Sequence, residues 1–175
     1  SDLSNAEPVD DVQEAITHIW NNSGIIANTL IIPVTDWWNL RRCDQIKNEI
    51  QAAGAGDATA IGLMTRQKVA TAIGLENILI AGTPYDSADK GQTASISPIW
   101  SATYAMVCYI DDSNDPTMPT LCRTFHWGRD GSTVGGTVEQ YRDESRRSEM
   151  YRVRHETDEK IMVKECGHLL GSISS

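Results

Sequence analysis

The sequence predicts an α+β fold in which a mixed β-sheet is flanked by helices. Three observations support this prediction. An amphipathic helical pattern lies near the start, short apolar runs separated by turn residues fill the middle, and a late charged segment alternates with a period of two. A chain of 175 residues buries about 70% of its unfolded surface on folding. It can therefore form one domain with a sizeable core, or two small lobes.

The first helix is expected between residues 10 and 22. Asp10 or Asp11 can cap its start, and Gly24 follows as a stop signal. Its apolar positions fall on one stripe, as the core-facing side of a helix requires. They are Val12, Ile16, Ile19 and Trp20.

Two further helical patterns follow along the chain. Thr35 or Asp36 can cap a segment that continues to Ile50, either as one helix or as two short abutting helices. A later helix is expected over Thr65–Ile73, and Gly74 ends it.

Strands are expected where β-branched and aromatic residues cluster between turn residues. The predicted strands are 28–32, which Pro33 ends, then 77–81, 99–110, 121–127 and the segments on either side of a turn at 157–159. Residues 77–81 are expected to form a buried strand, and 168–173 a short closing apolar segment. The polar segment 83–97, the turn cluster 111–119 and the glycine-rich 128–136 are expected to be loops.

Composition and charge exclude several classes of protein. No run approaches the roughly 18 apolar residues that span a bilayer, and residues 1–8 do not form a signal peptide. The net charge of −9 disfavours a dedicated nucleic-acid-binding protein, because neutralising phosphates needs a basic surface. Residues 139–165 hold eight acidic and seven basic side chains, so the negative charge is concentrated elsewhere.

Cysteines and histidines show no metal-binding spacing. The four cysteines lie far apart and form no CxxC pair, and the four histidines form no HxH or HExxH pattern. We expect four reduced thiols, ordinary roles for the histidines, and neither a metal nor a cofactor. Gly54 and Gly56 do not open a dinucleotide fingerprint, because Thr59 stands at the position of its third glycine.

Two pairings of cysteine with histidine leave an enzymatic alternative open. A nucleophilic thiolate needs a nearby imidazole to lower its pKa. Cys166 with His168, and Cys122 with His126, are close enough in sequence to be considered. They define the hypothesis of a small α+β thiol enzyme.

Two features are typical of contact surfaces. Trp37 and Trp38 are adjacent on a predicted helix, so their rings point about 100° apart. One ring is expected in the core, and the other can face a partner. A mixed-charge run follows later, and it fits either a solvated face or a subunit contact in which charges fix the register. It consists of Arg142, Glu144, Arg146, Arg147, Glu149, Arg152, Arg154 and Glu156.

The order of these elements resembles the C-terminal half of the major capsid proteins of tailed phages and prophages, which have the HK97-like fold. In that family an Ile-Pro and an aromatic-rich helix follow the long spine helix, and a VLVG-type strand leads into a loop. The resemblance covers most of the chain and depends on hydrophobicity and order rather than on invariant chemical groups. The segments that carry it are NTLIIPVTDWWNL, NILIAGTPYDSA, SPIWSATYAMVCYI and EMYRVRHETDEKIMVKECGHLLGSI.

This resemblance implies a domain organisation. Residues 1–27 would be a linker and the end of the spine helix in the peripheral domain, and 28–125 the axial domain around five-fold and six-fold axes. Residues 126–175 would be a loop and the strands that return to the peripheral domain. The family's amino-terminal arm, its extended loop and the first part of the spine helix have no counterpart. Because the chain also starts at Ser1, we expect it to be part of a longer protein.

The resemblance also implies a function without catalysis. The chain would be a subunit of an icosahedral head that encloses DNA and assembles through hexamers and pentamers, in the bacterial cytoplasm and then in the virion. Scaffolding, portal or decoration proteins would be partners, contact with packaged DNA would be weak, and no membrane would be involved. The residues expected at subunit contacts are Trp37, Trp38, Tyr85, Asp86, Arg146, Arg147, Arg152 and Arg154.

Three other functions stay open at this point. An encapsulin-type nanocompartment shell shares the fold but encloses a protein cargo. The thiol enzyme would use one of the two cysteine and histidine pairs. A partner-binding module would use Trp37 or Trp38.

Overall fold

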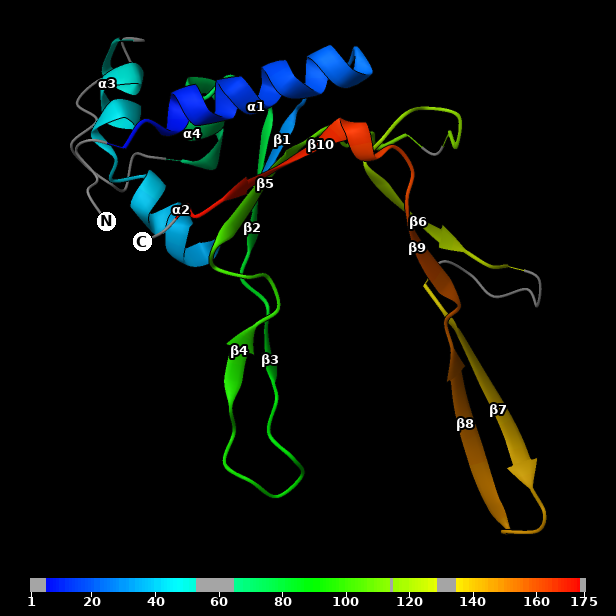
Figure 1. Cartoon of the computed structure of the whole chain (residues 1–175). Coiled ribbons are helices and arrows are strands. Elements are labelled where there is room, and N and C mark those ends of the chain that lie inside the picture. Colours follow the sequence, from blue (N-terminus) through cyan, green and yellow to red (C-terminus); the bar gives the residue numbers. More distant parts are fainter. Residues whose placement is uncertain (1–5, 53–64, 114, 129–134, 174–175) are drawn as a thin grey trace. The chain divides into compact units, whose positions relative to one another are not determined.

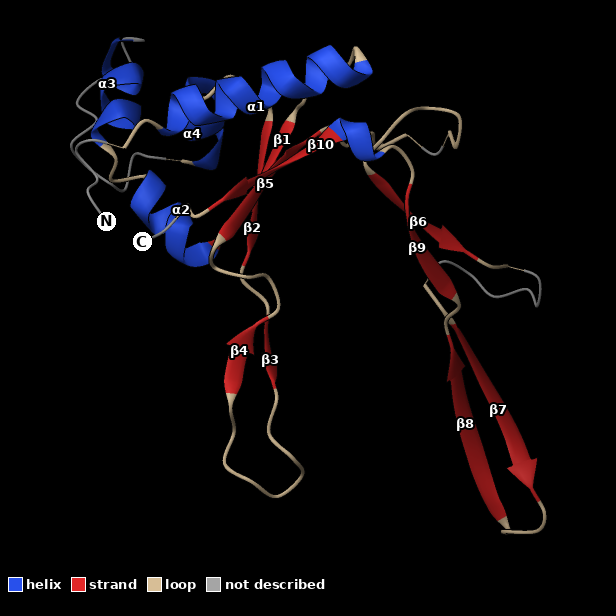
Figure 2. Ribbon diagram, viewed as in Figure 1, coloured by secondary structure: helices blue, strands red, loops and turns tan. Residues whose placement is uncertain are grey.

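The computed structural model describes residues 6–52, 65–113, 115–128 and 135–173. The chain is mixed α+β, as predicted, and its contacts divide it into two compact units. The first unit consists of Ser1–Leu121 and Val163–Ser175, and the second of Cys122–Met162. Among the described residues, helices occur only in the first unit, and the second unit consists of strands and loops (Figure 2).

The first unit contains four α-helices and six strands among its described residues. The helices are α1 (Pro8–Ser23), α2 (Val34–Leu40), α3 (Asp44–Ala52) and α4 (Arg66–Ala72). The strands are β1 (Thr29–Pro33), β2 (Asn77–Ala81), β3 (Pro84–Asp86), β4 (Ile96–Pro98), β5 (Tyr104–Cys108) and β10 (Gly167–Gly171). A short 3-10 helix, Lys164–Cys166, precedes β10.

A four-stranded mixed sheet with the order β10-β5-β1-β2 is the centre of the first unit (Figure 1). β1 runs parallel to β2 and antiparallel to β5, and β10 runs antiparallel to β5. The inner strand β1 has the sequence TLIIP and is buried at four of its five positions. Such a continuous apolar run fits a strand with neighbours on both sides.

The helix α1 matches its predicted position, but not its predicted cap or its whole predicted stripe. It begins at Pro8, whose fixed φ suits the first helical position, while Asp10 lies in the first turn and favours the helix dipole. Gly24 ends the helix in the left-handed conformation with φ 72°, as predicted. Trp20 is 53% exposed, so its predicted place on the core stripe is wrong.

The segment predicted as one helix or two contains the two helices α2 and α3. β1 continues directly into α2, so Val34 is the first helical residue and Pro33 takes the cap position. Asp36 therefore lies inside the first turn, and the prediction of a cap at Thr35 or Asp36 is wrong. Thr65 does cap α4, because its side chain accepts a hydrogen bond from the Lys68 N–H.

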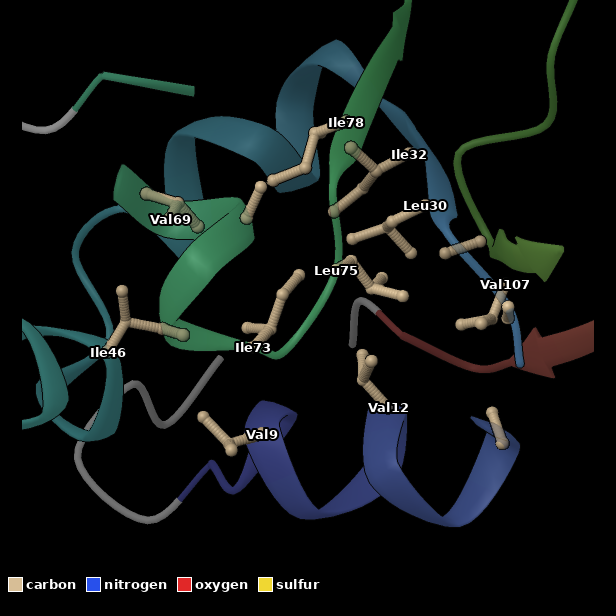
Figure 3. Packing of buried hydrophobic residues seen from close by; sticks show 14 of the residues in the cluster. Val9, Val12, Leu30, Ile32, Ile46, Val69, Ile73, Leu75, Ile78 and Val107 are labelled. Carbon is tan, nitrogen blue, oxygen red and sulfur yellow. The ribbon is translucent and has the colours of Figure 1, made fainter. Parts of the chain in front are cut away.

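The core of the first unit lies between the helices and the central sheet. α1 contacts β10 and β5, α2 contacts β1 and β2, and α4 contacts β2 and α3. Figure 3 shows Val69 and Ile73 at α4, Ile46 on the neighbouring α3, and the buried side chains of the sheet and of α1 around them. All three are fully buried.

Three predictions about the strands of this unit differ from the structure. The strand predicted over 99–110 is limited to β5, because Trp100 closes a local turn by donating its indole N–H to the Tyr104 carbonyl at 2.7 Å. The predicted loop 83–97 contains the β3–β4 hairpin, in which Pro84 pairs with Pro98. The strand β2 was predicted to be buried, but only Ile78 is buried, and Leu79 is 46% exposed at the sheet edge.

The second unit consists of two antiparallel two-stranded ladders, which together are called the ribbon. It contains β6 (Cys122–His126), β7 (Thr137–Asp143), β8 (Ser148–Arg154) and β9 (Thr157–Ile161). β6 pairs with β9, and β7 pairs with β8. The Trp127 N–H donates to the Glu156 carbonyl and extends the β6–β9 ladder by one further bond. The predicted turn at 157–159 is wrong, because those residues pair with 124–126.

The two units do not coincide with the predicted segments 28–125 and 126–175. The chain leaves the first unit after Leu121 and rejoins it at Val163. It rejoins because β10 pairs with β5 over five residues, which makes the C-terminal segment part of the central sheet. The assignment of axial and peripheral domains stays a prediction.

Candidate assembly surfaces

The ribbon of the second unit has no core of its own. None of its described residues is buried, whereas the core cluster found in the described chain lies wholly in the first unit. Isolated two-stranded hairpins are at best marginally stable in water, because they cannot cover an apolar face. The described strands of the ribbon therefore lie at the surface of the chain.

One face of the β7–β8 hairpin is apolar near its base. Val138 lies directly opposite Val153, and Gln140 lies opposite Tyr151. Paired residues in an antiparallel ladder share a face, so these side chains stand together. Val138 is 68% exposed, Val153 71% and Tyr151 65%. Exposed apolar groups gathered in this way are typical of a protein contact.

The opposite face of the hairpin is held by a charge cluster. Glu139 accepts a hydrogen bond from the Arg152 Nε at 2.8 Å, and it also pairs with Arg154. The hydrogen bond from Arg152 lowers the pKa of Glu139, and Glu139 raises the pKa of Arg152. The Arg152 guanidinium also lies over the Tyr141 ring, 5.9 Å from its centre. This cluster fixes the register of the two strands.

The four arginines predicted at subunit contacts all lie in this hairpin, in two different settings. Arg152 and Arg154 bind Glu139 inside the ribbon. Arg146 and Arg147 lie in the exposed turn between β7 and β8, where Arg146 is 3.8 Å from Asp143. Arg147 adopts a φ of 47°, in the left-handed region that non-glycine residues occupy mostly in turns. Their role in contacts stays a prediction.

The β3–β4 hairpin is the second exposed surface, and it carries Tyr85 and Asp86. Tyr85 is 50% exposed. Asp86 Oδ1 accepts hydrogen bonds from the N–H groups of Ala88 at 3.0 Å and Ser95 at 2.8 Å. These bonds lower the pKa of Asp86. Asp86 thus ties the two ends of the loop together, although the loop itself is exposed.

The tryptophan pair divides between core and surface. Trp37 is 6% exposed and belongs to the core cluster, with the Arg41 guanidinium 5.4 Å from its ring centre. Trp38 is 50% exposed. The prediction that at least one ring lies in the core is confirmed, and an interface role for Trp38 stays a prediction.

The geometry gives the two thiol pairs no support. Cys166 is fully buried, and the loss of hydration raises the pKa of its thiol, which disfavours a thiolate. Cys122 pairs with Ile161 and His126 with Thr157, so the two lie at opposite ends of the same ladder. Four residues of a strand separate them by about 14 Å. No disulfide joins any of the four cysteines.

The described residues form hollows of different sizes. A cavity of about 190 Å³ lies between α1, β1 and α2, which is smaller than the roughly 300–1,000 Å³ of typical ligand pockets. A hollow of about 630 Å³ in the ribbon is lined partly by Trp127 and Met162, which are 61% and 37% exposed. In the described chain, no three His, Cys, Asp or Glu side chains gather to hold a metal. None of its helices is long and apolar enough to cross a membrane.

Two histidines meet where α1 packs on β10. The rings of His18 and His168 are 4.6 Å apart between centres and tilted by 55°. Loss of hydration and the neighbouring His18 lower the pKa of His168, while Glu14 acts in the opposite direction. The neutral imidazole is therefore favoured in the folded chain.

This histidine contact predicts an acid-sensitive first unit. The pKa of His168 is lowered from its ordinary value of about 6.5. Stability is then complete above that value and decreases as the pH falls through the lower pKa of the folded state. Thermal melting between pH 8 and pH 5 should show this decrease, and His168→Gln should reduce it. His155→Gln removes a histidine from the second unit and is the matched control. Equal profiles for wild type and His168→Gln would contradict the prediction.

Three residues on the two faces of the β7–β8 hairpin were missed in the sequence. Val138, Glu139 and Tyr141 lie in β7, which was not predicted. The apolar residues of TVEQYRD, Val138 and Tyr141, are three positions apart and do not alternate at a period of two, so the segment resembles part of a mixed-charge run.

Comparison with known proteins gives a structural similarity and no family. No protein-family model matches the sequence, and no curated protein matches it. A solved structure with a similar fold is that of a phage-related protein from Bordetella bronchiseptica RB50, with a TM-score of 0.74 and 17% sequence identity. The match covers 97% of this chain and 51% of that protein. The chain thus shares its fold with a phage-related protein and spans about half of that protein's length.

Proposed function

We propose that this chain is a structural subunit of a bacteriophage or prophage head of the HK97-like type. Many copies form hexamers and pentamers that close into an icosahedral shell around DNA, and the subunit catalyses no reaction. It assembles in the bacterial cytoplasm and ends in the virion. Scaffolding, portal and decoration proteins are its partners beside further copies of itself.

The observation that carries this proposal is the uncovered ribbon. A segment of 41 residues, Cys122–Met162, forms paired strands without one buried residue in its described part. A monomer would expose Val138, Tyr151 and Val153 to water with no compensating contact. Chains that leave strands uncovered in this way gain stability by pairing with other subunits.

Two further observations agree with a shell subunit. The fold is similar to that of a phage-related protein. The order of elements in the sequence resembles major capsid proteins, and the charge of −9 fits a shell whose contact with DNA is weak and reversible.

Electron microscopy of the full-length protein, expressed with its neighbouring genes, tests the proposal. Uniform closed shells are expected, and nuclease-protected DNA inside them identifies a head. Shells that enclose a protein cargo and no DNA would instead identify an encapsulin-type compartment. Persistent monomers at every protein concentration would overturn the proposal.

A further inference from the structure

The exposed apolar face of the β7–β8 hairpin can be buried by a contact with a second copy of the chain. The distribution of charge indicates which surface of that copy it can contact. The second unit contains eight acidic and eight basic side chains, so its net charge is zero. The first unit contains sixteen acidic and seven basic side chains and therefore carries the whole charge of −9. First units of two copies repel each other, whereas the ribbon of one copy can approach the first unit of the next.

The helix α1 offers a surface that complements the ribbon. Its residues 10, 13, 14, 17, 20 and 21 recur at helical spacing and are all exposed. This outward stripe holds Asp10 and Glu14 near its start and Trp20 near its end. The whole helix contains no Lys or Arg. Trp20 is 53% exposed, and tryptophan is among the side chains that contribute most to protein contacts.

The spacing of apolar and charged groups agrees on the two surfaces. Along β8, five residues separate Val153 from Ser148, which is about 17 Å of strand, and the turn that holds Arg146 and Arg147 lies directly beyond Ser148. Along α1, ten residues separate Asp10 from Trp20, which is about 15 Å of helix. An extended hairpin can therefore place its valine pair on the tryptophan while its turn arginines reach the two carboxylates.

We propose that the β7–β8 hairpin of one copy docks on the outward stripe of α1 in a second copy. Val138 and Val153 cover Trp20, and Arg146 and Arg147 lie against Asp10 and Glu14. This inference rests on the proposed assembly and names the contact that performs it. The contact joins two different surfaces, so a bound pair still has one free hairpin and one free α1 stripe. Further copies can bind these free surfaces, and the assembly closes into a ring when the rotation from copy to copy allows it.

A pair of charge-reversed variants of the full-length protein tests this contact. The ribbon variant carries Arg146→Glu and Arg147→Glu, and the stripe variant carries Asp10→Arg and Glu14→Arg. Each alone places like charges together and should need at least about tenfold more protein to assemble. An equimolar mixture should assemble again, because each variant then meets a partner with the opposite charge. All four changes in one chain should also restore assembly.

The readout is oligomer mass by light scattering, with thermal melting to confirm that each variant is folded. Arg66→Glu with Lys68→Glu makes the same charge change as the ribbon variant, at one exposed and one half-buried position of α4, and it should leave assembly unchanged. Val138→Thr with Val153→Thr keeps β-branched side chains but removes the apolar contact, and it should weaken assembly to a similar degree as Trp20→Ser. If the stripe variant fails to fold, the valine double variant and Trp20→Ser still test the contact.

The outcomes separate the contact from the proposed function. A wild-type protein that never assembles overturns both. A wild-type protein that forms shells, together with folded stripe and Trp20→Ser variants that assemble as well as wild type, overturns the contact alone. A mixture of the two folded charge variants that fails to assemble does the same, because no charge pairing between the two surfaces then exists.

Discussion

Replacing Ile73 by alanine is expected to lower the free energy of unfolding of the first unit by about 2–5 kcal/mol. Ile73 is fully buried where α4 ends, and its backbone N–H bonds to the Val69 carbonyl at 3.1 Å. Figure 3 shows its side chain between α4 and the sheet, among other buried side chains. Removing three carbons there leaves a cavity that several elements would have to move together to fill.

Ile26→Ala is the matched control for this core change. Ile26 is 66% exposed in the same unit, so the same chemical change should alter stability by no more than about 0.5 kcal/mol. Urea unfolding followed by tryptophan fluorescence measures both variants. A loss at Ile73 no larger than the loss at Ile26 would mean that the buried cluster does not hold this unit together.

Much of the first unit could be predicted because its signals are local. Gly24 and Gly74 both adopt positive φ where a helix ends, and Thr65 caps α4 through its side chain. The strands β1 and β2 match the predicted 28–32 and 77–81 to within one residue. Helix spacing, caps and short apolar runs act over a few residues, so one sequence is enough to show them.

The unpredicted features depend on contacts between distant segments. β10 belongs to the central sheet because it pairs with β5, about 60 residues earlier in the chain. Residues 157–161 look like a turn followed by isolated apolar residues, yet they form β9 because β6 lies beside them. Trp20 continues the apolar spacing of α1 but points away from the core. Sequence spacing alone does not distinguish a core position from a contact position.

The candidate contact surface could be predicted only in part for the same reason. The arginines of the late segment stood out by their charge, and all four lie in one hairpin. Their division into two groups depends on Glu139, which binds Arg152 and Arg154 but not the turn. That pairing follows from the β7–β8 register, which places Glu139 opposite Arg152 and could not be read before the strand β7 was known.

Shortening the ribbon is expected to abolish assembly while the first unit stays folded. Thr137 and Arg154 are directly opposite each other, so a two-residue Asn-Gly turn can join them in place of 138–153. The deletion removes no buried residue among those described and breaks no contact of the core cluster. The urea midpoint of the first unit should therefore stay close to that of wild type, while light scattering should detect only small species.

The urea midpoint and the light scattering together distinguish three possible roles of the ribbon. If the ribbon had no role in contacts between copies, the shortened protein would form particles at the wild-type yield. If it were part of the fold of the first unit, the urea midpoint would fall, because its apolar side chains would have been covering that core. Only a contact surface between copies combines an unchanged midpoint with lost particles. That combination follows from strands that expose Val138, Tyr151 and Val153 and bury nothing.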